Sequence, residues 1–78
     1  MGTTRDEATR HRLLREAAYE FARLGYEAAS LRKIAERVGI RAATVYSHFP
    51  GGKAQLYEDI LGTVSSLLLE RIARRYGQ

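Results

Sequence analysis

The chain has 78 residues, no cysteine and a formal net charge of +4. This length allows one small domain, which buries only about 60% of its unfolded surface, and the lack of cysteine excludes a disulfide framework or a thiolate metal site. No apolar run approaches the ~20 residues of a membrane-spanning helix, and the residues after Met1 lack the apolar core of a secretory signal, so we expect a cytoplasmic protein that does not enter membranes.

A first helix is predicted to begin after Thr4 and to end at about Leu24. The segment Thr4-Arg-Asp-Glu7 fits a capping box, in which the N-cap threonine and the glutamate three residues later each bind the other's backbone amide. Gly25 is placed to end the helix, because glycine adopts the left-handed conformation of the position after the C-cap at little cost. The residues expected to face inward, at close to a 3.6-residue period, are Leu13, Leu14, Ala17, Ala18, Phe21 and Leu24.

Residues 30–49 predict a helix-turn-helix, with helices at about 30–38 and 41–49. Ser30 has the side chain of an N-cap, and Gly39 supplies the tight turn between the helices. The outer face of the second helix is small, hydroxylated and cationic, which suits the DNA major groove. The inward-facing residues are Leu31, Ile34, Ala35, Val38, Ile40, Val45 and Phe49, and those left to face a partner are Ala42, Thr44, Ser47 and His48.

A last helix is predicted from about Lys53 to Arg75, a length of ~35 Å. It follows Pro50-Gly51-Gly52, because proline cannot extend the preceding helix without losing a hydrogen bond. Its apolar stripe is longer than a three-helix head can cover, so we expect Val64 to Ile72 to pack against something outside this chain. The stripe consists of Leu56, Tyr57, Ile60, Leu61, Val64, Leu67, Leu68 and Ile72.

The excess positive charge lies in the predicted helix-turn-helix. Residues 30–53 contain five basic residues and one acidic residue, whereas residues 1–29 and 54–78 are each neutral. This concentration is expected of a phosphate-binding surface, and its alternative is an ordinary solvated face. The basic residues are Arg32, Lys33, Arg37, Arg41 and Lys53, of which we expect Lys33 and Arg37 to contribute only diffuse electrostatics.

From about Arg12 to Leu61 the chain resembles the DNA-binding head of TetR-family transcriptional repressors. The segments that carry the resemblance are Phe21-Ala-Arg-Leu-Gly-Tyr26, Ser30-Leu-Arg-Lys-Ile-Ala-Glu-Arg-Val-Gly-Ile40, Arg41-Ala-Ala-Thr-Val-Tyr-Ser-His-Phe49 and Lys53. The resemblance implies an all-α fold, in which a three-helix, homeodomain-like helix-turn-helix head is followed by the start of a long fourth helix. It implies sequence-specific DNA binding and transcriptional regulation, with repression as the family's usual mode.

Three positions depart from the family pattern. Arg41 stands where the family usually has serine, so the side-chain N-cap of the reading helix is lost and a cation is gained. Ala43 stands where glycine is usual and adds a methyl group toward the DNA. Three residues, in place of the common two, separate Phe49 from Lys53, and the extra glycine shifts Lys53 relative to the pattern.

The resemblance assigns a base contact to Arg32, and arginine pairs well with guanine edges. The first turn of the reading helix points at base edges. Tyrosine, serine, histidine and lysine side chains and helix N-termini bind phosphates without reading sequence. The predicted base-reading residues are Arg32, Arg41, Ala42, Ala43 and Thr44, and the predicted phosphate-binding residues are Ser30, Tyr46, Ser47, His48 and Lys53. The alternatives are ordinary helix surface for each, a half-buried ring for Tyr46 and a flexible turn before Lys53.

Family members act as homodimers on near-palindromic operators in double-stranded DNA. Dimerisation and small-molecule effector binding reside in a larger C-terminal domain, which this chain would lack as a fragment or as an unusually short relative. Residues 1–53 would then be the DNA-binding domain, and residues 53–78 the fourth helix that leads to the missing domain.

We expect no enzyme activity, cofactor or metal site. Ser47 and His48 are adjacent on a helix and diverge, so they cannot form a nucleophile–base pair, and two histidines 37 positions apart do not suggest zinc binding. The rival function is a small helical protein–protein interaction module that uses the apolar half of the last helix.

Overall fold

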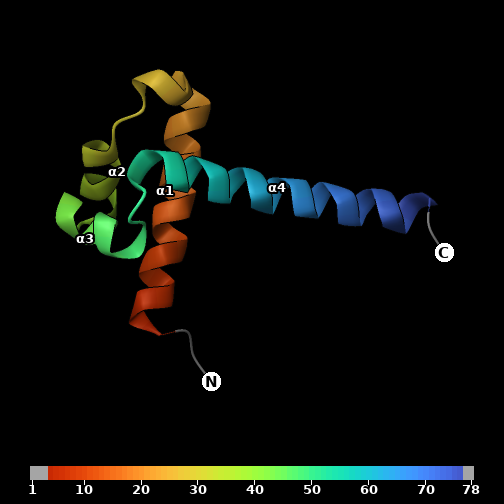
Figure 1. Ribbon diagram of the computed structural model, residues 1–78, viewed down its shortest axis with the longest axis horizontal. Helices are drawn as coiled ribbons and strands as arrows, with labels where there is room; N and C mark the ends of the chain where they lie inside the picture. The colour runs from red at the N-terminus through yellow and green to blue at the C-terminus, as the bar shows by residue number, and fades with distance from the viewer. Residues whose placement is uncertain (1–3, 77–78) are drawn as a thin grey trace.

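The computed structural model describes residues 4–76 and contains four helices in that range, with no strand (Figure 1). Helix α1 spans Arg5–Ala28, α2 spans Leu31–Val38, α3 spans Ala42–His48 and α4 spans Gly52–Tyr76. In Figure 1, α2 and α3 lie on one side of α1, and α4 crosses α1 and then runs away from the other helices. The predicted all-α helix-turn-helix class is therefore confirmed.

The capping box at the start of α1 is formed as predicted. The Glu7 backbone N–H donates to Thr4 Oγ1 over 3.1 Å, and the Thr4 backbone N–H donates to Glu7 Oε1 over 3.2 Å. The predicted end is only partly right. Gly25 interrupts the helix with a positive φ of 83°, which favours glycine as expected, but its ψ of 167° is not that of a left-handed helix, and a short helical segment continues to Ala28.

Leu24 was expected to face inward, and this is wrong, because 41% of it is exposed. Near the end of α1, the Phe21 ring packs against the rings of Tyr26 and Tyr57, at centroid distances of 5.7 and 5.2 Å. Leu24 lies outside that contact, so the predicted stripe loses its last member.

The core is shared by all four helices and contains most of the predicted inward-facing residues. Leu31 and Ile40 are partly buried against it. Gly39 makes the turn with a left-handed conformation, at φ 86° and ψ 30°, and its N–H donates to the Ala35 carbonyl over 2.9 Å. The fully packed cluster consists of Leu13, Ala17, Ile34, Ala35, Val38, Val45, Phe49 and Leu56.

Helix α4 begins at Gly52, one residue before the predicted start, and the backbone and packing at this position favour glycine. Its φ is +66°, and a Cβ atom on it would lie 3.0 Å from Cε1 of Tyr46. The first turns of α4 pack on the head through Leu56 and Ile60, and an Arg10–Asp59 ion pair of 3.1 Å ties them to α1.

The second half of α4 projects into solvent, as the length of its stripe predicted (Figure 1). No helix of the described residues combines the length and apolar character needed to cross a bilayer. The large apolar side chains exposed on α4 are Leu61, Val64, Leu67, Leu68, Leu69 and Ile72.

Candidate nucleic-acid interface

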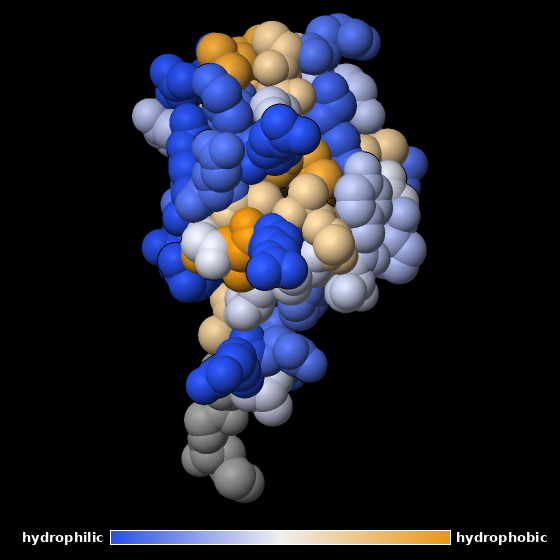
Figure 2. All heavy atoms as spheres, turned by 90° about the vertical axis from the view of Figure 1, so that its left-hand side faces the viewer, coloured by the Kyte–Doolittle hydropathy of each residue, from blue (hydrophilic) through white to orange (hydrophobic). Residues whose placement is uncertain are grey.

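Helices α2 and α3 present a mostly hydrophilic face with apolar side chains in patches, as Figure 2 shows from that side of the molecule. Most of the predicted site residues belong to these two helices or their caps. Their side chains differ in exposure: Arg32, Arg41, Ala43, Tyr46 and Ser47 are exposed, and Ser30, Ala42, Thr44 and His48 are partly buried.

The N-terminus of α2 is fixed by Ser30. Its Oγ accepts a hydrogen bond from the Lys33 backbone N–H over 3.2 Å, which is the predicted N-cap. The hydroxyl hydrogen of Ser30 is not used in this bond, so it is free to donate to an anion. Arg32 lies exposed two residues later, on the first turn.

The N-terminus of α3 has no side-chain cap. Arg41 occupies the N-cap position, where its carbonyl accepts from the Thr44 and Val45 backbone N–H groups and its side chain makes no capping hydrogen bond. This confirms the predicted loss of a serine-type cap. The Arg41 guanidinium stays exposed at the end of the helix whose positive dipole attracts anions.

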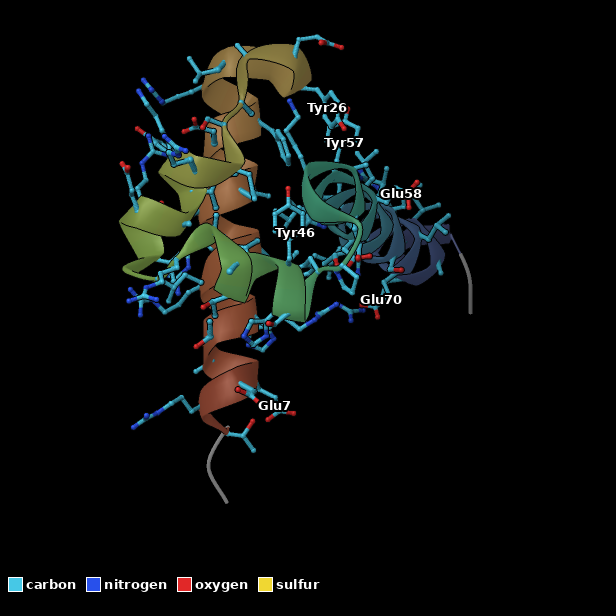
Figure 3. The ribbon with its side chains drawn as sticks, turned by 60° about the vertical axis from the view of Figure 1, so that its left-hand side comes forward. Glu7, Tyr26, Tyr46, Tyr57, Glu58 and Glu70 are labelled. Atoms are coloured by element: carbon cyan, nitrogen blue, oxygen red, sulfur yellow. The ribbon has the colours of Figure 1, made fainter. Side chains whose placement is uncertain are left out.

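The C-terminal half of α3 carries the three polar side chains predicted to bind phosphate. The Tyr46 ring lies between α3 and the first turn of α4 (Figure 3), and 51% of the residue is exposed. Its hydroxyl makes no hydrogen bond to a described residue. Ser47 donates a long hydrogen bond of 3.5 Å to the Ala43 carbonyl. His48 ends the helix beside the buried Phe49.

The Lys53 side chain is bonded to the backbone at the end of α1. Its Nζ donates to the carbonyls of Tyr26, Ala29 and Glu27 over 2.8, 3.2 and 3.4 Å, and it sits 4.5 Å from the centre of the Tyr26 ring. An ammonium has three N–H donors, and all three have acceptors here. The structure therefore holds this side chain against the backbone, and its predicted phosphate contact stays a prediction.

The backbone amides before Lys53 are also occupied. The Gly51 N–H donates to Gln55 Oε1 and the Gly52 N–H donates to the Phe49 carbonyl, each over 2.8 Å. These two N–H groups are therefore already bonded to acceptors of the chain at the start of α4.

The structure corrects the role of Arg37, which was expected to act only through diffuse electrostatics. Its guanidinium donates to Glu20 Oε1 over 2.5 Å and lies 5.2 Å from the centre of the Tyr19 ring. Glu20 is completely buried. Sequence reasoning missed this pair, although one signal was available: Glu20 follows Leu13 and Ala17 at the i+7 and i+3 positions of the inward stripe.

These contacts reduce the cationic surface that the sequence predicted. Of its five basic side chains, Arg37 is paired with a carboxylate and Lys53 with carbonyls. Arg32, Lys33 and Arg41 remain exposed and make no ion pair with any residue from 4 to 76. All three come from the first turns of α2 and α3 or from their caps, so the remaining positive charge is concentrated at two helix N-termini.

A comparison with models of known protein families gives a match over the helix-turn-helix. A family model described as bacterial regulatory proteins, tetR family, matches residues 13–60. These residues include all of α2 and α3, most of α1 and the first turns of α4. Searches of curated proteins and of solved structures found no significant match.

Proposed function

The chain belongs to the TetR family of bacterial regulatory proteins, and from this premise we propose that it is the operator-reading head of a transcriptional repressor. Membership of this family makes the chain a DNA-binding transcription regulator. The observation that carries the finer proposal is the exposure of Arg41, uncapped and unpaired among the described residues, at the N-terminus of α3. A helix presented in this way suits the major groove, where arginine reads guanine with two hydrogen bonds.

The two kinds of contact come from different parts of this surface. We assign base reading to Arg32 on α2 and to the first turn of α3 with its cap, namely Arg41, Ala42, Ala43 and Thr44. The alanine and threonine methyl groups are suited to thymine methyls. Phosphate binding falls to Ser30, Tyr46, Ser47 and His48, whose donors position the head without selecting a sequence.

The exposed half of α4 supports the proposal that DNA binding and dimerisation belong to separate domains of a longer protein. Residues 1–53 form the DNA-binding domain in this proposal, and residues 53–78 begin a helix that leads to a C-terminal dimerisation and effector-binding domain. The apolar side chains on α4 offer the surface on which such a domain packs. A cytoplasmic homodimer then holds two heads on a near-palindromic operator, and a small molecule bound by the C-terminal domain changes their spacing.

Base reading by Arg41 is tested by comparing sequence preferences. Wild-type protein and the Arg41→Ala variant are presented at low salt with the same array of duplexes. We expect the variant to lose the preference at one or two base pairs, at a cost of about 1–3 kcal/mol for the favoured base. Lys33→Ala is the matched control, because loss of a cation that acts only through diffuse electrostatics weakens all sequences alike. Uniform weakening by Arg41→Ala would contradict base reading.

A second function, protein–protein interaction, is favoured by a separate observation. A groove of about 410 Å³ lies between α1 and α4, with an apolar floor of Leu14, Ala18, Ile60 and Val64, and the exposed α4 face continues from it. An interface of this kind depends little on salt, whereas phosphate binding weakens steeply as salt rises. The salt dependence of binding therefore separates the two functions.

A further inference from the structure

The segment 26–30, which comprises the last three residues of α1 and the connection to α2, is held by charged side chains of α1 and α4. Lys53 reaches it from α4 and binds three of its carbonyls, those of Tyr26, Glu27 and Ala29. Glu20 reaches it from α1, and its Oε2 accepts from the Ser30 backbone N–H over 3.5 Å. A cation therefore satisfies the carbonyls and an anion satisfies an amide of the same five residues.

Aromatic rings reinforce the attachment on the α4 side. Tyr57 lies one turn after Lys53, and its ring is 4.9 Å from the Tyr26 ring and 5.2 Å from the Phe21 ring. Figure 3 shows Tyr26 and Tyr57 next to each other at this junction. The first two turns of α4 are thus attached to the end of α1 and to Ala29 through hydrogen bonds and ring contacts.

The Glu20 side is equally constrained. The carboxylate is completely buried and is shared between the Ser30 amide and the Arg37 guanidinium of α2. A buried carboxylate is costly unless it is paired, so the Ser30 backbone and Arg37 are held near it. Ser30 is the N-cap of α2, and the connection ends where the proposed DNA surface begins.

We propose that Lys53 and Glu20 are positioning residues for DNA binding, which together fix the N-terminus of α2 relative to α4. The inference rests on the proposed function, because it concerns how Ser30 and Arg32 are held for DNA. Lys53 acts through the backbone of residues 26–29 rather than by touching a phosphate. A displacement of the first turn of α4 is passed to Ser30 through the Ala29 carbonyl.

The test uses Lys53→Met, with Lys53→Gln as a milder variant that keeps two N–H donors, and Arg74→Met as the charge-matched control. Arg74 lies exposed near the far end of α4. Amide hydrogen exchange is measured on the free proteins, and the affinity for a duplex is measured at several salt concentrations under conditions where circular dichroism shows each protein folded.

We expect Lys53→Met to speed exchange at the Ala29 and Ser30 amides by about tenfold or more, the loss expected for a hydrogen bond to a charged group. Its affinity for DNA falls while the slope of log affinity against log salt stays at the wild-type value. Lys53→Gln also speeds exchange at these two amides and lowers the affinity for DNA, but by less. Arg74→Met leaves the exchange at these two amides unchanged.

The opposite result identifies a direct phosphate contact. Wild-type exchange at both amides in Lys53→Met and Lys53→Gln, with a salt slope reduced by about 0.9, would overturn the inference. Failure of the proposed function has a different signature: the wild-type protein then shows no salt-sensitive binding, whatever the exchange rates of the variants are.

Discussion

Single residues decide where the helices of this chain begin and turn. Thr4 and Ser30 are N-caps whose bonding partners lie three residues away, and Gly39 adopts the left-handed conformation after α2. These features were predictable because their physical causes are local in sequence. The role of Lys53 was not, because its acceptors lie 24 to 27 positions earlier in the chain, and no local pattern indicates such a contact.

The conformation of Gly39 makes a prediction about stability. Nothing lies within 4 Å of a Cβ placed on it, so Gly39→Ala meets only backbone strain, at φ +86°. We expect the free energy of unfolding to fall by about 1–2 kcal/mol, the cost of left-handed backbone for an L-residue. Urea denaturation followed by circular dichroism measures this.

Gly62→Ala is the matched control for this substitution. Gly62 lies inside α4 with equally open space and no positive φ, so alanine there should raise stability by up to about 1 kcal/mol through helix propensity. If both variants change stability in the same direction, the turn is not strained as described.

At the scale of elements, the packing of α2 on α1 combines an apolar stripe with one buried ion pair. The stripe residues Ile34, Ala35 and Val38 were predictable from their spacing, and they are buried. The Glu20–Arg37 pair was not predicted, because the two residues are 17 positions apart and both were counted only as charges. The wrong prediction for Leu24 has a similar cause, because the helical period places Leu24 on the inward stripe but does not show where the core ends.

Breaking the Glu20–Arg37 pair should destabilise the domain. Arg37→Met leaves a buried carboxylate without its cation, which costs about 3–5 kcal/mol for fully buried pairs. We expect about 2 kcal/mol here, because 31% of the Arg37 side chain is exposed to solvent that screens the charge. Thermal and urea denaturation at neutral pH measure the change.

The double variant Glu20→Leu/Arg37→Met provides the control, because it removes both charges and leaves apolar side chains at the junction. Its stability should return to within about 1 kcal/mol of the wild type, or exceed it, as found when buried ion pairs are replaced by apolar groups. A double variant as unstable as Arg37→Met alone would show that the loss came from packing and not from the unpaired carboxylate.

For the whole molecule, the sequence predicted the architecture and overestimated the charge available to a partner. The head, the long fourth helix and its uncovered apolar half were predictable, because each follows from helix periodicity and chain length. The number of exposed cations on the helix-turn-helix was not, because tertiary contacts use Arg37 and Lys53. The domain division and the individual DNA contacts stay predictions.

The most direct test of the central claim is a fluorescence anisotropy titration of the chain against duplex DNA at several salt concentrations, with a Tyr46→Phe/His48→Ala variant beside it. A single head should bind in the nonspecific range, with a dissociation constant of ~10⁻⁴ to 10⁻⁶ M. The three exposed cations Arg32, Lys33 and Arg41 bring about three positive charges to the DNA surface, which predicts a slope of about −2.7, so affinity falls about 40-fold between about 50 and 200 mM salt. The variant binds more weakly to every sequence, because it has lost phosphate contacts.

A slope near −4.5, which corresponds to a loss of about 500-fold over the same range, would mean that Arg37 and Lys53 also contact DNA, against the roles assigned to them. An affinity that does not depend on salt concentration, or no binding at low salt, would contradict DNA binding by this surface and favour a protein partner on α4.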